Sequence, residues 1–309
     1  MGTMDHHSHT ATGSRSGHRL RLMAALLITG GIVVAQLVGA WVTGSLALLT
    51  DAVHSFTDTI GLGVALVAAT LMFRAATATR TWGFRRVEIL AGFLQATLLL
   101  GIGIYAAVEG ISRLSSPPQI PPVELMVFGA VGLVGNIASM AVLNASRKAN
   151  FNMRAAFLEV AADALGSLGV VVAGVVIWTT GFQQADAAAG LLIAALIIPR
   201  ALKLLVETAR ILLEFAPKGL DLEKVRQHML QLEHVEKVHD LHASTVATGL
   251  PVISAHVVVD ESCFRAGCAP DKLAELQACV AEHFDVGVQH STFQLETRDI
   301  AASETHVHT

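Results

Sequence analysis

The stretch LMAALLITGGIVVAQLVGAWVTGSLALLT at residues 22–50 contains no charged residue. A helix crosses the roughly 30 Å hydrocarbon core of a bilayer with about 20 apolar residues, so this stretch is long enough to span a membrane. Five further apolar stretches follow, two without charges and three with only a few. The sequence therefore predicts an all-α bundle of six membrane helices, and the further stretches are 52–73, 89–108, 125–146, 155–180 and 186–206.

The composition agrees with a membrane location. Of the 309 residues, 53% are hydrophobic and only 15% are charged, which is too apolar for an ordinary soluble protein. The first apolar stretch is much longer than the roughly 7 to 15 residues of a signal-peptide core, so we expect it to remain in the mature protein. The net charge of −4 gives no general attraction to nucleic acid, and we expect none as a partner.

Lysine and arginine residues gather in alternate connections between the predicted helices, and the other connections hold only Arg113. Basic segments resist translocation and stay on the cytoplasmic side. Both termini are therefore predicted to be cytoplasmic, in what we expect to be a bacterial inner membrane. The basic residues are Arg15, Arg19 and Arg21 before the first helix, Arg74, Arg80, Arg85 and Arg86 after the second, and Arg147, Lys148 and Arg154 after the fourth.

A second domain begins after residue 215, where charged residues become frequent and Pro217 and Gly219 mark a boundary. Apolar residues recur at helical spacing in 222–232 and 273–284, and stretches ending at 260 and 296 alternate as strands do. The order helix, strand, strand, helix, strand predicts a small α+β domain that docking to a second copy would help to stabilise. We expect a flexible cytoplasmic N-terminus at 1–19, a six-helix domain at 20–213, a cytoplasmic α+β domain at 217–298 and a flexible tail at 299–309.

The three cysteines, Cys263, Cys268 and Cys279, all lie in the second domain. The distribution of basic residues places that domain in the reducing cytoplasm. An odd number of cysteines in such a compartment implies no disulfide framework.

Four ionisable residues lie inside the predicted membrane helices in two matched pairs. His54 and Asp58 are four residues apart in the second helix, and Glu159 and Asp163 are four apart in the fifth. This spacing places each pair on one helix face. Facing one another, the two pairs offer one imidazole and three carboxylates, which complete a tetrahedral shell for a divalent cation.

The alternative is that these groups only hydrogen-bond between helices, as polar residues in membrane bundles often do. That interpretation buries three carboxylates with no lysine or arginine expected at comparable depth, at about 2.5 to 3.5 kcal/mol per charge on insertion scales. We therefore prefer a metal site. For Asp51, one turn before His54, we expect a helix-end cap or a mouth-lining position rather than ligation.

The segment Gly44-Ser-Leu-Ala-Leu-Leu-Thr-Asp-Ala-Val-His-Ser-Phe-Thr-Asp58 resembles the second-helix signature of the cation diffusion facilitator family. Segments 82–90, 152–167 and 239–242 resemble other parts of the same family, so the likeness covers nearly the whole chain. The resemblance implies a homodimer that exchanges cytoplasmic Zn²⁺ for protons by alternating access and carries a metallochaperone-like, ferredoxin-like C-terminal domain. It also implies that His54, Asp58, Glu159 and Asp163 are the transport ligands.

One position departs from the family pattern, which commonly has a histidine where this chain has Glu159. A carboxylate oxygen is a harder ligand than an imidazole nitrogen, so the metal preference relaxes from zinc toward cobalt, cadmium or manganese. Zinc remains the first expectation. Residues 74–86 and 147–154 contain no histidine, so we assign no metal site to either loop.

Histidine 54 also suggests how protons are exchanged for metal. Neutral imidazole binds metal and protonated imidazole does not, and its unperturbed pKa of roughly 6.5 allows both forms near neutral pH. Metal entering from the cytoplasm would then be displaced by protons from the other side.

The C-terminal domain offers a weaker second metal site. Its candidate ligands are His239, His242, His256, His290 and Glu296, from which we select His239, His256 and His290. The alternating pattern alone would place His239 in the core beside Leu241, and the family resemblance is what favours it as a ligand. Terminal histidines are expected to be solvated: His6, His7, His9, His306 and His308.

Two other classes of function remain open. A membrane metal sensor would use the helices as an anchor and the C-terminal domain as its output. An intramembrane metalloenzyme would need an activated water, and the His-Glu-x-x-His motif of many zinc proteases is absent, so we do not expect an enzyme.

Overall fold

The computed structural model describes residues 11–71, 76–144 and 151–303. Contacts divide the chain into two units, one comprising Met1–Val64 and Leu94–Leu204 and the other Ala65–Phe93 and Leu205–Thr309. The first unit is helical, and the second contains a three-stranded sheet. The predicted fold class, six membrane helices followed by a small α+β domain, is confirmed.

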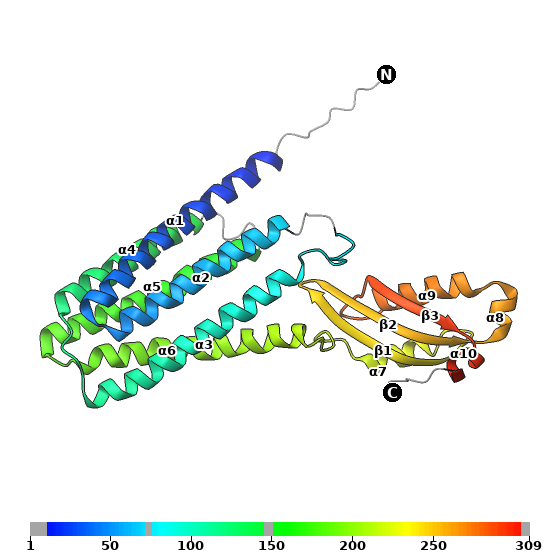
Figure 1. The fold of residues 1–309 in the computed structure, drawn as a ribbon. Helices are drawn as coiled ribbons and strands as arrows, with labels where there is room; N and C mark the ends of the chain where they lie inside the picture. Colours follow the sequence, from blue (N-terminus) through cyan, green and yellow to red (C-terminus); the bar gives the residue numbers. More distant parts are fainter. Residues whose placement is uncertain (1–10, 72–75, 145–150, 304–309) are drawn as a thin grey trace, which may run out of the picture. The chain divides into compact units, whose positions relative to one another are not determined.

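In the described residues, six long helices precede the sheet, and Figure 1 labels them α1 to α6. α1 begins at Ala11, inside the segment 1–19 that we expected to be flexible, because an established helix extends into further residues at little cost. The histidines before residue 11 lie outside the described residues. The helices are α1 (Ala11–Thr43), α2 (Leu46–Leu71), α3 (Arg86–Ser115), α4 (Pro122–Asn144), α5 (Phe151–Thr180) and α6 (Gln184–Leu212).

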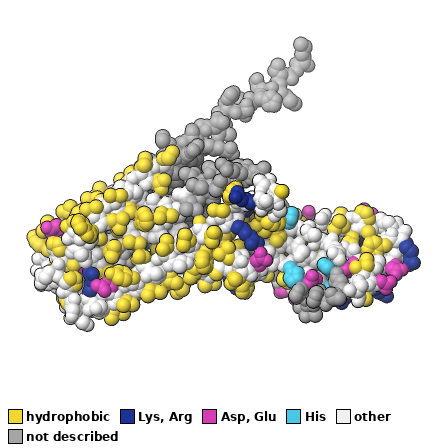
Figure 2. Space-filling view, viewed as in Figure 1, with side chains coloured by type: hydrophobic (Ala, Val, Ile, Leu, Met, Phe, Trp, Pro, Cys, Tyr) yellow, Lys and Arg dark blue, Asp and Glu magenta, His cyan; other side chains and the backbone are white. Residues whose placement is uncertain are grey.

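Within the described residues, five helices are long and apolar enough to cross a membrane: α1, α3, α4, α5 and α6. The remaining long helix, α2, has the polar side chains Asp51, His54 and Asp58 in its first half. Figure 2 shows hydrophobic side chains over the visible surface of the helical unit. Trp41 is 87% exposed and Leu165 67%. Such side chains are stable against lipid rather than water, so the chain is an integral membrane protein.

The turn between α1 and α2 fixes where the helix that carries His54 and Asp58 begins. Gly44 has a φ of 70°, which glycine adopts without steric cost. The carboxylate of Asp186, in the first turn of α6, accepts a hydrogen bond of 2.8 Å from the Leu46 amide and another from the Ser45 hydroxyl. Asp186 thus satisfies amides that have no partner within α2 and ties the start of α2 to α6.

The second unit contains the predicted order of helices and strands. β1 and β2 pair antiparallel, β2 and β3 pair parallel, and the sheet order is β1-β2-β3 (Figure 1). The helix α10 begins at Arg298, so part of the tail expected to be flexible at 299–309 is helical; His306 and His308 lie outside the described residues. The elements are α7 (Leu222–Met229), β1 (Val235–Ala247), β2 (Leu250–Val259), α8 (Glu261–Ala266), α9 (Ala269–Glu282), β3 (His290–Glu296) and α10 (Arg298–Ser303).

One face of the sheet carries the core of this domain. Ile253, Ala255 and Val257 alternate along β2 and are at most 3% exposed, as the strand pattern predicted. They belong to the same hydrophobic cluster as Met229 of α7 and Leu276 of α9, both fully buried. The apolar faces of α7 and α9 therefore pack together with the sheet, and this packing fixes where their polar side chains lie.

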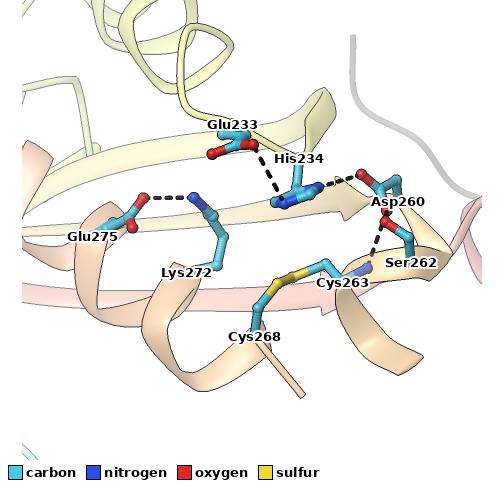
Figure 3. The surroundings of a disulfide bond; sticks show 8 residues. All are labelled: Glu233, His234, Asp260, Ser262, Cys263, Cys268, Lys272 and Glu275. Carbon is cyan, nitrogen blue, oxygen red and sulfur yellow. Dashed lines mark hydrogen bonds and ion pairs between the residues drawn. A yellow bond between two sulfur atoms is a disulfide. The ribbon is translucent and has the colours of Figure 1, made fainter. Parts of the chain in front are cut away.

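The expectation of no disulfide is wrong for this structure, which joins Cys263 and Cys268 (Figure 3). Gly267 takes a left-handed conformation at the end of α8, and the Cys268 amide donates to the Cys263 carbonyl oxygen at 3.0 Å. This turn brings the two cysteines together. The prediction rested on the reducing cytoplasm and the odd number of cysteines, and neither depends on this local geometry. Beside them, hydrogen bonds from Ser262, His234 and the Cys263 amide lower the pKa of the Asp260 carboxyl.

Candidate metal centre

The centre of the helical unit contains three ionisable side chains from two helices. His54 and Asp58 lie one turn apart on α2, with His54 Nδ1 3.5 Å from Asp58 Oδ2. Asp163 of α5 faces them, and its Oδ1 is 3.8 Å from His54 Nε2. One ligand atom from each residue lies within 4.8 Å of the others, and all three residues are buried. The two helix faces predicted from the spacing therefore meet.

Several polar atoms of this cluster have no hydrogen-bond partner among the described residues. They are His54 Nδ1, Asp58 Oδ2 and Asp163 Oδ1, and each is inaccessible to solvent. Leaving a buried polar atom unsatisfied costs about 1 to 3 kcal/mol, and more for a charged group. A divalent cation would engage such atoms, since carboxylate oxygen and imidazole nitrogen are both ligands of zinc and its neighbours. The donor set fits a metal ion.

The fourth expected ligand, Glu159, lies outside this three-residue cluster. Its carboxylate accepts a hydrogen bond from Arg200 of α6, and Arg200 Nη1 also lies 4.0 Å from Asp58 Oδ2. The sequence argument that no basic residue lies at comparable depth is therefore wrong. Arg200 follows Pro199 within the last apolar stretch, and its contact with Glu159 joins α6 to α5.

Asp51 differs from the expected helix-end cap. It lies in the second turn of α2 and is only 1% exposed. Its Oδ2 accepts hydrogen bonds from Gln36 Nε2 at 2.6 Å and Ser167 Oγ at 2.9 Å. Asn136 of α4 lies 3.5 Å from the same serine oxygen. Asp51 thus joins α1, α2 and α5 in a buried polar network, and Asn136 has a hydrogen-bonding role.

The C-terminal domain brings together two of the three histidines selected there. His239 and His256 are opposite one another on β1 and β2, and their ring centroids are 5.3 Å apart. The third member of the cluster is Glu296, whose Oε1 lies 2.5 Å from His239 Nε2 and whose Oε2 lies 3.8 Å from His256 Nδ1. His290 is not in this cluster. It precedes Gln294, the β3 partner of His256, by four residues, about 13 Å along a strand.

His239 is buried, as the alternating pattern predicted, but a bulge in β1 places it on the face of the sheet opposite the apolar core. Asp240 has a φ of 50°, and the register with β2 shifts between His239 and His242. Such an extra residue reverses the alternation of the side chains that follow. Leu241 therefore lies in the apolar core. His239 pairs with His256, whose neighbours on β2 point into the core, so both histidines lie on the other face of the sheet.

Together, the apolar helices and the buried acid and histidine cluster define a membrane protein with side chains that could hold a divalent cation. Comparison with known families gives a more specific assignment. Residues 22–213 match the cation efflux transmembrane domain, and residues 217–297 match the cytoplasmic domain of cation efflux proteins. The chain belongs to the cation efflux family, also called the cation diffusion facilitators, which transport metal cations across membranes.

Individual relatives cover nearly the full length of the chain. The metal cation efflux system protein CzcD of Cupriavidus metallidurans is 37% identical over 96% of this chain and 90% of its own. The zinc transporter ZitB of Escherichia coli is 33% identical over 97% and 96%. The cadmium, cobalt and zinc/H⁺-K⁺ antiporter of Bacillus subtilis is 32% identical over 94% and 92%. These names cover several divalent metals.

Proposed function

We propose that this protein exports Zn²⁺ from the cytoplasm in exchange for protons, by alternating access of one intramembrane site. The observation that carries the proposal is the group of buried, unsatisfied ligand atoms on His54, Asp58 and Asp163. The same groups can bind protons when they do not bind metal, so cation and proton can replace each other at one place. The names of the relatives support both zinc and antiport.

Glu159 is the fourth transport ligand in this proposal. In the structure it is paired with Arg200, so it would join the metal only after leaving the guanidinium. Arg200 offsets part of the negative charge of the three carboxylates while the metal is absent. Arg200 would therefore compete with the metal ion for the carboxylates, and it would also favour release of the bound ion. The carboxylate-rich shell also allows Co²⁺, Cd²⁺ or Mn²⁺ as a second substrate.

A second zinc site in the C-terminal domain is proposed at His239, His256 and Glu296. The burial of His239 and Glu296, at 4% and 1% exposed, supports a preformed arrangement. Glu296 takes the place that the sequence prediction gave to His290. Metal bound there would join β1, β2 and β3, so we propose a regulatory rather than a transport role.

We further propose that the protein is a homodimer in a bacterial inner membrane with both termini in the cytoplasm. The distribution of lysine and arginine among the connections supports this orientation. The match of residues 217–297 to the cytoplasmic domain of cation efflux proteins supports a cytoplasmic second unit.

Flux measurements with purified protein in liposomes test the proposed transport. Under an imposed pH gradient, we expect wild-type protein to move Zn²⁺ and counter-move protons, and His54→Ala and Asp163→Ala to abolish both movements. Glu124→Gln is a matched control because this exposed carboxylate lies in the first turn of α4. Parallel runs with Cd²⁺, Co²⁺ and Mn²⁺ give the metal preference.

Metal binding without net movement would instead support a sensor or an enzyme. Full transport by both His54→Ala and Asp163→Ala would refute the proposed site. Zinc movement that neither requires nor dissipates the pH gradient would refute proton antiport while leaving the site intact.

A further inference from the structure

We infer that His228, Cys279 and His283 form a further site for a divalent transition metal such as Zn²⁺, Co²⁺ or Cd²⁺. The three residues lie in the C-terminal domain, and one ligand atom from each is within 4.8 Å of the others. None of them belongs to the intramembrane site or to the cluster of His239, His256 and Glu296. The inference does not depend on the proposed transport reaction.

The fold positions these ligands from two helices. His228 lies near the end of α7, next to the fully buried Met229. Cys279 lies on the buried face of α9, and His283 is the C-terminal cap of the same helix, where its amide donates to the Cys279 carbonyl oxygen at 3.1 Å. The four-residue spacing brings the Cys279 and His283 side chains to the same side of α9. The packing of α7 against α9 then brings His228 to them.

The two imidazole nitrogens require only a small movement to accept an ion. His228 Nε2 and His283 Nδ1 are 3.0 Å apart and share a hydrogen bond, and their rings are 4.9 Å apart. Two nitrogens bound to tetrahedral zinc at about 2.0 to 2.1 Å lie about 3.3 Å from each other. Replacing the hydrogen bond by a metal therefore separates the nitrogens by a few tenths of an ångström.

The donors determine the class of cation. One thiolate and two imidazoles are soft and borderline ligands, which favour zinc, cobalt and cadmium over magnesium or calcium. Cys279 is 1% exposed and is the free cysteine of this domain, whereas His283 is exposed. The ion would thus have a buried sulfur on one side and solvent access on the other. Three protein ligands leave the fourth position of a tetrahedral ion to water.

Cobalt titration of the purified full-length protein tests this site, because a thiolate bound to Co²⁺ gives a charge-transfer absorption in the near ultraviolet. We expect this absorption in the wild type and in a Cys263→Ser/Cys268→Ser variant, in which Cys279 is the remaining cysteine. Cys279→Ser should abolish it. Added Zn²⁺ should bleach it.

Substitution of the exposed ligand avoids disturbing the core. His283→Gln should weaken cobalt binding by about tenfold or more, since even residues that only support metal ligands contribute 10 to 100-fold. Asp163→Ala and Glu296→Gln should leave the absorption unchanged. The inference is overturned if the wild type shows no thiolate absorption, or if His228→Gln/His283→Gln retains wild-type absorption and affinity. In that case the two histidines form only a hydrogen-bonded pair over a buried thiol.

Discussion

Arg200 adds a positive charge to the proposed intramembrane site that the sequence argument did not foresee. The sequence places three carboxylates there, and the structure adds a guanidinium that contacts Glu159 and lies 4.0 Å from Asp58. A positive charge close to a cation site weakens cation binding. The side chain of Arg200 is 49% exposed, so solvent screens this effect without removing it.

A double-mutant cycle measures this coupling. Arg200→Gln should tighten Zn²⁺ binding by about tenfold because the repulsive charge is removed and Glu159 becomes available. Glu159→Gln should weaken binding by a similar factor, since Arg200 then lacks its partner. The double variant should bind Zn²⁺ more weakly than the wild type, because the part of the Arg200→Gln gain that comes from freeing Glu159 is then lost. Calorimetric titration of detergent-solubilised protein measures all four proteins, and a double variant with wild-type affinity, the sum of the two opposite single effects, would show that the two side chains do not interact.

The third ligand of the proposed site in the C-terminal domain is Glu296 in the structure, whereas the sequence analysis selected His290. In an Asp163→Ala background, Glu296→Gln should lower the zinc retained after equilibrium dialysis by about one ion per chain. His290→Ala should leave it unchanged because His290 lies outside the cluster. The reverse pattern would restore the sequence-based assignment.

At the scale of elements, the buried polar network and the glycines of α5 determine how closely α2 and α5 approach. A methyl group at Gly166 would lie 2.2 Å from Asp51 Oδ1, whereas one at Gly169 would have no heavy atom within 4 Å. These two glycines are less than one turn apart on the same helix. The structure shows that the two positions are not equivalent.

Gly166→Ala should therefore destabilise the helical unit, and Gly169→Ala should not. The expected cost for Gly166→Ala is about 1 to 3 kcal/mol, as for other overpacked positions, with disruption of the Gln36–Asp51–Ser167 hydrogen bonds. Thermal unfolding in detergent, followed by size-exclusion chromatography, gives the comparison. Equal stability of the two variants would mean that Asp51 can move away at no cost.

At the scale of the whole molecule, the two units have separate hydrophobic cores. The core of the C-terminal domain contains Leu276, Met229 and Val257, and that of the helical unit contains Leu48, Leu125 and Val170. Among the described residues, none belongs to both of these clusters. Packing damage in one core should therefore leave the other largely intact.

Leu276→Ala tests this independence. Loss of a fully buried leucine should destabilise the C-terminal domain by about 2 to 5 kcal/mol. Calorimetry should show the unfolding transition of the C-terminal domain at a lower temperature and that of the helical unit unchanged. The Zn²⁺ affinity of the proposed intramembrane site should also be unchanged. A parallel shift of both transitions would indicate that the units unfold together.

The sequence by itself determined the six membrane helices, the α+β order of the second domain and the pairing of His54 with Asp58. These features follow from local rules: the length of apolar stretches, the alternation of strands and the 3.6-residue period of a helix. The tertiary structure decided which residues from distant segments contact the candidate ligands. Arg200 reaches Glu159 across 41 positions, and Glu296 reaches His239 across 57. Local periodicity contains no information about such contacts, because helix packing, strand register and the bulge at Asp240 set them.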